Sequence, residues 1–209
     1  MKVFFHYCTY GFSNCYILGA EGKTKEDGPG IAVIIDPGNM DEQILNFIES
    51  NDYSLKAVLV THDHVNHVHG LKTLKRIYGV EIYAVNHVIQ DHKTSLVHDG
   101  DVIEIGPFRA GVISIPGHSS DSAVFRVDRL LFTGDALTAG LVGRTASGYG
   151  AVVQMNALRS KILSLPGDFI ILPGHGPPSS LEAERRFNMG VRNFDETKSR
   201  RTAFRVDYL

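Results

Sequence analysis

Short apolar segments alternate with longer amphipathic segments along most of the chain. Short runs rich in β-branched and aromatic side chains and bounded by Gly, Asn or Pro are typical of strands. Strands are predicted at residues 2–6, 14–18, 31–36, 56–60, 80–85, 108–115, 123–127, 130–132 and 169–172. Apolar residues that recur every three to four positions predict helices. These lie within residues 40–48, 71–78, 152–163 and 181–189. Because strands and helices intermix from end to end, the pattern predicts one α/β domain over residues 1–209, with helices covering the sheet faces.

Two segments follow neither pattern. Residues 19–30 are polar and rich in glycine, which predicts a surface loop. Residues 193–209 mix charges of both signs with Phe194, Phe204 and Tyr208, and we expect this tail to dock as a strand or helix, or to fray.

Composition narrows the class of protein. Of the 209 residues, 43% are hydrophobic and 21% charged, which is ordinary for a globular chain and excludes general disorder. The net charge of −2 gives no basic field for nucleic acid or an anionic membrane. The N-terminus lacks a signal-peptide pattern, and no apolar run approaches the roughly 20 residues that span a bilayer. We therefore expect a cytoplasmic protein with neither a nucleic-acid nor a membrane partner. The sequence leaves the oligomeric state open.

The two cysteines are too few for a disulfide framework or a four-thiolate zinc site. Cys8 and Cys15 flank a predicted hairpin turn near residues 10–12, which could place them opposite each other on neighbouring strands. We expect both to be reduced and half-buried.

Histidine is the unusual residue of the composition, with ten in the chain, four of them within residues 62–69. This cluster follows the predicted strand 56–60 and precedes a predicted helix. His62 and His64 are two positions apart at the strand tip, so their side chains point the same way. His67 comes round in the turn that opens the helix. His69 starts the helix, and we expect it to lie beside the cluster.

The same construction recurs at three later strand ends, where an apolar strand runs into one or two small or turn residues and then His118, Asp135 or His175. Side chains at the carboxyl ends of several strands can converge on one crevice. Imidazole and carboxylate ligands suit zinc or ferrous iron better than calcium or magnesium. The pattern therefore predicts a metal site. The remaining histidines have no such context, and we expect ordinary structural or solvated roles for them: His6, His87, His92 and His98.

These motifs resemble the metallo-β-lactamase-fold hydrolases, which carry H-x-H-x-D-H, a later His, a bridging Asp and a last His. The similarity runs from Asn14-Cys15-Tyr16 and Asp36-Pro37-Gly38 to the region after His175. It implies a four-layer αββα sandwich with metals at one edge of the paired sheets. The ligands implied for the first metal are His62, His64 and His118. His67 and His175 are implied for the second, with Asp135 bridging both.

Finer motifs resemble the short single-domain members of the glyoxalase II branch. They are residues 131–137, 142–145, 173–177 and 184–188. The resemblance implies a metallohydrolase that uses a metal-bound hydroxide to cleave a carbonyl ester or thioester bond. It also implies a small-molecule substrate, acyl-glutathione or a related thioester. Asp135 would both bind metal and orient the nucleophile. Arg144, in a glycine-punctuated loop, would bind a substrate carboxylate.

One residue departs from the family motif, because Asn66 stands where the motif has Asp. An amide lacks the charge of a carboxylate, so we expect a filled first site and a second site that is weak or selective for its metal. Asp63 and His69 are possible substitute ligands. Zinc is the favoured ion, with Fe²⁺ and Mn²⁺ as alternatives. Two other readings remain open: an iron-dependent persulfide dioxygenase of the same fold, and a metal-poor, non-catalytic binding module.

Overall fold

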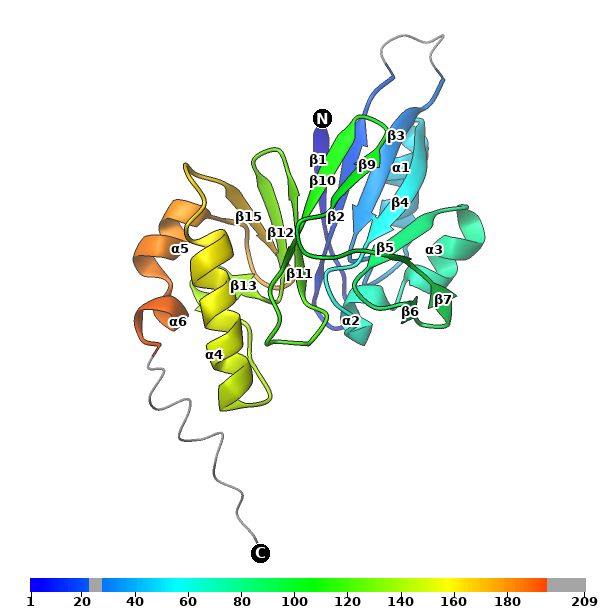
Figure 1. The fold of residues 1–209 in the computed structure, drawn as a ribbon. Coiled ribbons are helices and arrows are strands. Elements are labelled where there is room, and N and C mark those ends of the chain that lie inside the picture. The colour runs from blue at the N-terminus through cyan, green and yellow to red at the C-terminus, as the bar shows by residue number, and fades with distance from the viewer. Residues whose placement is uncertain (23–27, 195–209) are drawn as a thin grey trace, which may run out of the picture.

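The computed structural model describes residues 1–22 and 28–194. Within them, two six-stranded sheets face each other and helices cover both outer faces (Figure 1). The expected four-layer αββα sandwich is confirmed. The predicted tail from residue 195 onwards lies outside the described residues.

The first sheet has the strand order β1-β2-β3-β4-β5-β8. Its members are β1 (Lys2–Tyr7), β2 (Asn14–Ala20), β3 (Gly30–Ile35), β4 (Tyr53–Leu59), β5 (Glu81–Ala84) and β8 (Ser95–Leu96). The first three strands pair antiparallel and the others parallel. Two helices cover its outer face, α1 (Glu42–Ser50) and α3 (Leu71–Ile77), and a short helix α2 (Val65–Val68) precedes α3.

The second sheet has the order β16-β15-β12-β11-β10-β9. Its members are β9 (Val102–Ile105), β10 (Phe108–Ser114), β11 (Ala123–Val127), β12 (Leu130–Gly134), β15 (Ile170–Pro173) and β16 (Ser179–Ser180). All its pairings are antiparallel except β12 with β15, which is parallel. The helices on this side are α4 (Gly148–Ala157), the π-helical turn η2 (Leu158–Ile162), α5 (Leu181–Phe187) and α6 (Met189–Arg192). Two small hairpins complete the described chain, β6 (Val88–Ile89) with β7 (His92–Lys93) and β13 (Leu137–Thr138) with β14 (Leu141–Val142).

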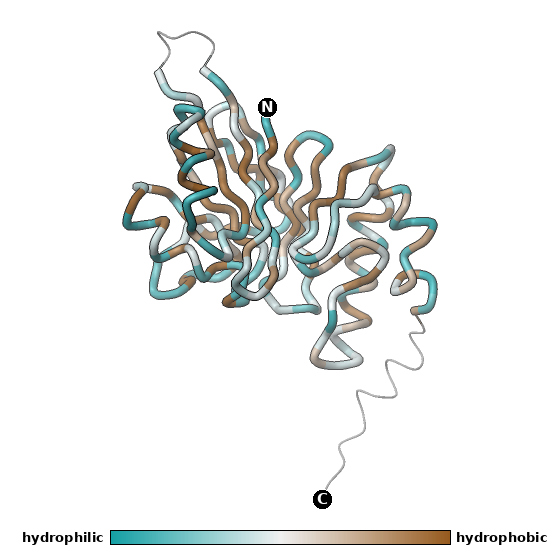
Figure 2. Tube along the Cα trace, turned by 180° about the vertical axis from the view of Figure 1, so that it is seen from behind, coloured by the Kyte–Doolittle hydropathy of each residue, from teal (hydrophilic) through white to brown (hydrophobic). Residues whose placement is uncertain are grey.

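Apolar side chains fill the spaces between the layers. In Figure 2 the hydrophobic residues, coloured brown, lie mainly along the strands of the interior. Tyr16 and Phe132 belong to the cluster between the two sheets, where their rings meet edge to face. Separate clusters lie beneath α1 and α3 and beneath the helices of the second sheet. Strands that are buried on both faces have nearly continuous apolar sequences. For this reason the apolar runs of the chain predicted these strands correctly.

Three expectations need correction. The helix predicted at 152–163 begins earlier, at Gly148, because the Ser147 side chain caps it, and it ends in a π-helical turn. The helix predicted at 181–189 is two helices, since the Asn188 side chain caps α6 by accepting from the Val191 N–H. Finally, β9 and the small strands within residues 86–105 were not predicted.

The two cysteines also differ from expectation. Both are free, as predicted, but both are fully buried rather than half-buried. Cys15 pairs with His6 in the β1–β2 register, while Cys8 lies just beyond the end of β1.

No helix among residues 1–22 and 28–194 is long and apolar enough to cross a membrane.

Candidate metal centre

The six predicted ligands meet at one end of the sandwich, where connections from both sheets come together. His62 and His64 follow β4, and His67 lies in α2. His118 lies between β10 and β11, Asp135 directly follows β12, and His175 follows β15. The ends of strands distant in sequence therefore supply one site.

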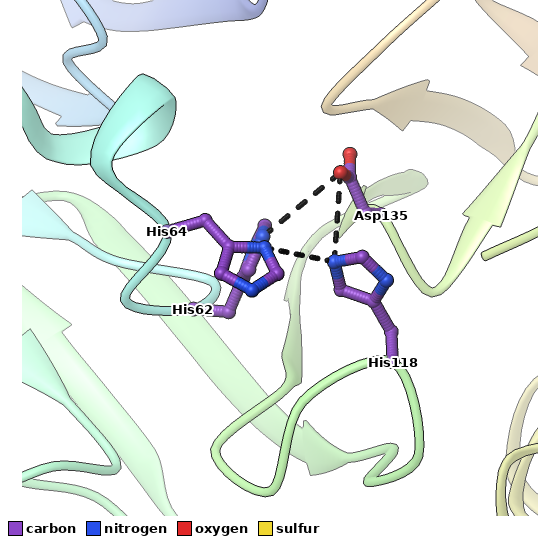
Figure 3. Close-up of side chains that lie close together, drawn as sticks. All are labelled: His62, His64, His118 and Asp135. Carbon is purple, nitrogen blue, oxygen red and sulfur yellow. Dashed lines mark hydrogen bonds and ion pairs between the residues drawn. The ribbon is translucent and has the colours of Figure 1, made fainter. Parts of the chain in front are cut away.

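Three histidines and the aspartate form the first group of side chains (Figure 3). His64 Nδ1 lies 3.0 Å from His118 Nε2, and Asp135 Oδ2 lies 3.6 Å from that same His118 nitrogen. His62 Nε2 is 3.9 Å from Asp135 Oδ2. One ligand atom from each of the four residues lies within 4.8 Å of all the others.

Asp135 also joins the first group to a second, which contains His67 and His175. Asp135 Oδ1 lies 2.7 Å from His175 Nδ1 and 3.6 Å from His67 Nε2. The two carboxylate oxygens of Asp135 thus face different groups, which is the arrangement that a bridging role requires.

The donor atoms fit a divalent cation. Among the described residues, His62 Nε2 and His67 Nε2 are buried without a hydrogen-bond partner, and both face Asp135. A buried polar atom without a partner is costly, whereas a metal ion would satisfy it. Burial, together with the neighbouring His67 ring, lowers the pKa of His62 to about 2, so that its imidazole is the neutral form that metals bind.

The Asp36 carboxylate orients His67. Asp36 Oδ2 lies 3.1 Å from His67 Nδ1, and Thr61 donates to the same carboxylate from its backbone N–H and its hydroxyl. A carboxylate that holds one ring nitrogen leaves the other free for a metal, a common second-layer contact in metal sites. No role was predicted for Asp36. Its position directly after a strand, in the run Asp36-Pro37-Gly38, could have indicated a residue of the site.

His118 is oriented by the main chain. Its Nδ1 donates to the Arg144 carbonyl oxygen at 2.8 Å, which leaves Nε2 directed at His64 and Asp135. Arg144 lies between β14 and α4, and its side chain, which was predicted to bind substrate, is exposed. The contribution of the Arg144 carbonyl was missed because side-chain type does not encode a main-chain contact.

A second carboxylate missed by the sequence analysis fixes the loop of His62 and His64. Asp121 is buried and accepts from the Asp63 backbone N–H at 2.9 Å and from Asn86 Nδ2 at 3.0 Å. The possible substitute ligand Asp63 is absent from the groups of described side chains that could hold a metal.

Asn66 lies at the second group. Its side-chain Nδ2 is 3.1 Å from His175 Nε2, and its main-chain carbonyl oxygen accepts from the Ser13 hydroxyl. The Gly11 carbonyl oxygen lies 3.3 Å from the same His175 nitrogen. The position of the motif's acid is therefore taken by a neutral amide in direct contact with His175.

Close packing around Asp135 depends on a glycine. A Cβ placed on Gly174 would lie 2.5 Å from both Asp135 Oδ1 and His67 Cε1. Since real side chains do not approach so closely, only glycine lets the chain after β15 pass beside these ligands.

The charges of the site support one another. Burial alone would raise the pKa of the Asp135 carboxyl, but His175 and His67 outweigh burial and hold that pKa well below its usual range. Burial would likewise lower the pKa of His67, but Asp135 and Asp36 raise it to about 9. Asp135 is therefore a carboxylate at neutral pH, and without a metal the His67 imidazole is protonated. A metal that binds at His67 must displace that proton.

Two other histidines have structural contacts. His6 Nε2 lies 2.8 Å from Asp41 Oδ2, and the exposed His69 ring stacks on Tyr10 with centroids 3.9 Å apart. His69 was predicted to start a helix, but it follows the last residue of α2 and precedes α3. It is outside the groups of described side chains that could hold a metal.

Comparison with known proteins identifies relatives. Residues 8–175 match the family described as the metallo-beta-lactamase superfamily. Hydroxyacylglutathione hydrolase GloC of Haemophilus influenzae is 31% identical over 199 residues, covering 84% of this chain and 91% of that protein.

Solved structures share the fold. The crystal structure of ETHE1 from Myxococcus xanthus has a TM-score of 0.82 and 24% identity, covering 100% of this chain and 92% of that one. The BLEG-1 B3 metallo-beta-lactamase has a TM-score of 0.79 and 23% identity, covering 91% and 99%. At these identities the likeness concerns the fold alone.

Proposed function

Because the chain belongs to the metallo-beta-lactamase superfamily, we propose that it is a metal-dependent hydrolase that cleaves thioesters of the acyl-glutathione type. The observation that best supports this proposal is that five histidines and one aspartate lie close together. Two of their imidazole nitrogens, His62 Nε2 and His67 Nε2, are buried without a hydrogen-bond partner. The hydrolase GloC, at 31% identity, supports the thioester as substrate.

In this proposal His62, His64, His118 and Asp135 would hold the first metal, and His67, His175 and Asp135 would hold the second. A bound divalent metal, with zinc favoured, lowers the pKa of a water ligand towards 7 and polarises a carbonyl group. Thr61, Asp36 and the Arg144 carbonyl keep the ligand imidazoles in position. Preorganised ligands avoid the cost of reorganisation during the reaction.

The Asp135 carboxylate contacts both groups through its two oxygens, and its negative charge would help to orient a nucleophilic water. The exposed Arg144 side chain, on the loop that also orients His118, binds a carboxylate of the thiol part of the substrate. Asn66 would lower the metal affinity of the second group, because its amide adds no negative charge there.

The test is metal content and hydrolysis measured on the same purified protein. We expect bound zinc, iron or manganese by elemental analysis, and release of thiol from lactoylglutathione. His64→Ala should lower both the metal content and the rate. His69→Ala is the matched control, an exposed histidine that stacks on Tyr10, and it should change neither. A metal-loaded protein that cleaves no thioester or lactone of a broad panel overturns the proposal.

A second candidate, an iron-dependent persulfide dioxygenase, is favoured by Asn66, because that reaction needs a single iron. Oxygen uptake with glutathione persulfide, without cleavage of thioesters, would select it. A protein that retains no metal and gains no activity from added zinc, manganese or iron would instead be a non-catalytic binding module.

A further inference from the structure

A depression of about 330 Å³ adjoins the candidate metal centre, with His118 in its wall. This volume lies within the range of sites that hold small organic ligands. Apart from His118, the lining side chains carry no formal charge, and they include Pro116, Ala146, Tyr149 and Val153. An occupant of the depression is therefore next to a ligand of the candidate metal and meets largely apolar walls.

The depression exists because α4 packs directly on the loop before His118. Gly117 has φ +140°, and a Cβ there would lie 2.4 Å from Gln154 Cβ and 2.6 Å from the Gly150 carbonyl oxygen. Only glycine permits this approach. The contact brings the first turns of α4 beside the candidate metal centre.

The walls contributed by α4 are apolar although they face open space. Tyr149 and Val153 are four positions apart, so they share one face of the helix. Tyr149 is 71% exposed, more than any other large hydrophobic side chain in the described residues. The Ser119 hydroxyl lies 2.7 Å from the Ser122 hydroxyl, so these two hydroxyl groups form a hydrogen bond with each other. Beside the candidate metal centre, these apolar walls can bury the apolar part of a small ligand.

We propose that this depression binds an apolar acyl chain, with Tyr149 and Val153 as specificity-determining residues. The inference rests on the proposed thioester hydrolysis. Glutathione carries charged carboxylates and an ammonium group, which apolar walls do not accommodate, whereas an acyl chain is uncharged. The substrate class is then a thioester whose acyl group is an alkyl chain longer than acetyl.

The kinetic test compares acetyl-, butyryl- and hexanoyl-glutathione on the metal-loaded protein. Each methylene group that enters the depression should raise kcat/KM about fourfold. Tyr149→Ala should lower kcat/KM for the hexanoyl thioester about tenfold or more, and should lower it much less for the acetyl thioester. Phe187→Ala is the matched control, because Phe187 is 66% exposed on α5 and does not line the depression.

A second variant fills the space instead of opening it. Ala146 is exposed at the wall, and Ala146→Phe should remove the preference for longer acyl chains while acetyl-glutathione is still cleaved. Equal kcat/KM for all three thioesters in the unaltered protein, or an equal loss on all three in Tyr149→Ala, would overturn the proposal.

A binding measurement separates this inference from the proposed function. Acetate and hexanoate, the acyl products, are titrated by NMR into metal-loaded protein, which requires neither hydrolysis nor a particular thiol. Hexanoate should bind more tightly than acetate, and Tyr149→Ala should abolish the difference. If no thioester is cleaved but this difference appears, the hydrolase proposal fails and the apolar site stands. If thioesters are cleaved and both acids bind alike, the apolar site fails alone.

Discussion

At the scale of single residues, the candidate metal centre is ordered by protein groups that each hold one imidazole nitrogen. Thr61, Asp36 and the Arg144 carbonyl contact Nδ1 of three different histidines, and in each case Nε2 faces the cluster. Such contacts fix ring orientation before a metal arrives. Strand-end motifs predicted the residues of the candidate metal centre but not these partners, since the partners depend on which loops meet in three dimensions.

Asn66 leads to a prediction about metal stoichiometry. We expect the unaltered protein to keep about one metal per chain after dialysis, and Asn66→Asp to keep two, because a carboxylate beside His175 adds negative charge to the second group. Elemental analysis measures this directly. Asn66→Ala is the control and should stay at one. Two metals that survive dialysis in the unaltered protein would contradict the prediction.

Asp36 leads to a prediction about metal affinity. Asp36→Asn removes the charge that holds His67 Nδ1, and the affinity for metal should fall about 10- to 100-fold. Competition with a chromophoric chelator measures the change. Asp41→Asn is the matched control, since Asp41 also contacts a histidine, His6, but lies outside the candidate groups. Equal losses in the two variants would mean that the effect is general destabilisation.

At the scale of elements, the long periodic segments were predicted and the short ones were not. Two-residue strands such as β6 and β7 are too short to show a period. The division between α5 and α6 also left no periodic signal, because it depends on the Asn188 side chain. On charge alone, residues 184–188 would be a solvated helix face, yet Glu184 and Asn188 are buried. Asn188 Nδ2 donates to the Leu141 carbonyl and to the Glu184 carboxylate.

The junction between α5 and α6 should therefore contribute to stability. Asn188→Ala leaves the buried Glu184 carboxylate without one donor and removes the cap of α6, and we expect a loss of about 2–4 kcal/mol in the free energy of unfolding. Urea denaturation measures it. Glu182→Ala, which removes an exposed pair with Arg186, should change stability by less than about 1 kcal/mol. A similar small change in Asn188→Ala would show that the junction is not stabilising.

At the scale of the whole molecule, the intermixed strands and helices predicted the α/β class, whereas the face-to-face pairing of two sheets came from the family resemblance. The hydrophobic periodicity of the sequence predicts which residues are buried, but it does not predict which sheet each strand joins. The candidate metal centre draws on both sheets, since β4 belongs to the first and β10, β12 and β15 to the second. A metal held there connects the two layers.

Metal removal should therefore lower the stability of the entire molecule. A ligand that binds only the folded state stabilises it, by about 2.7 kcal/mol at a free concentration 100 times its dissociation constant. We expect a chelator to lower the urea midpoint and added zinc to restore it. The same treatment of His64→Ala should have a smaller effect. Identical midpoints with and without metal would contradict a site that joins the sheets.

The contact between His118 and position 144 has a consequence for how this protein can diversify. Position 144 supports the imidazole through a carbonyl oxygen that every amino acid possesses, while its side chain is exposed. Natural variation or saturation mutagenesis at this position can therefore sample new substrate contacts without altering the support of His118. In such a loop the side chain at position 144 can change, and with it the substrate contacts, while the position of His118 is preserved.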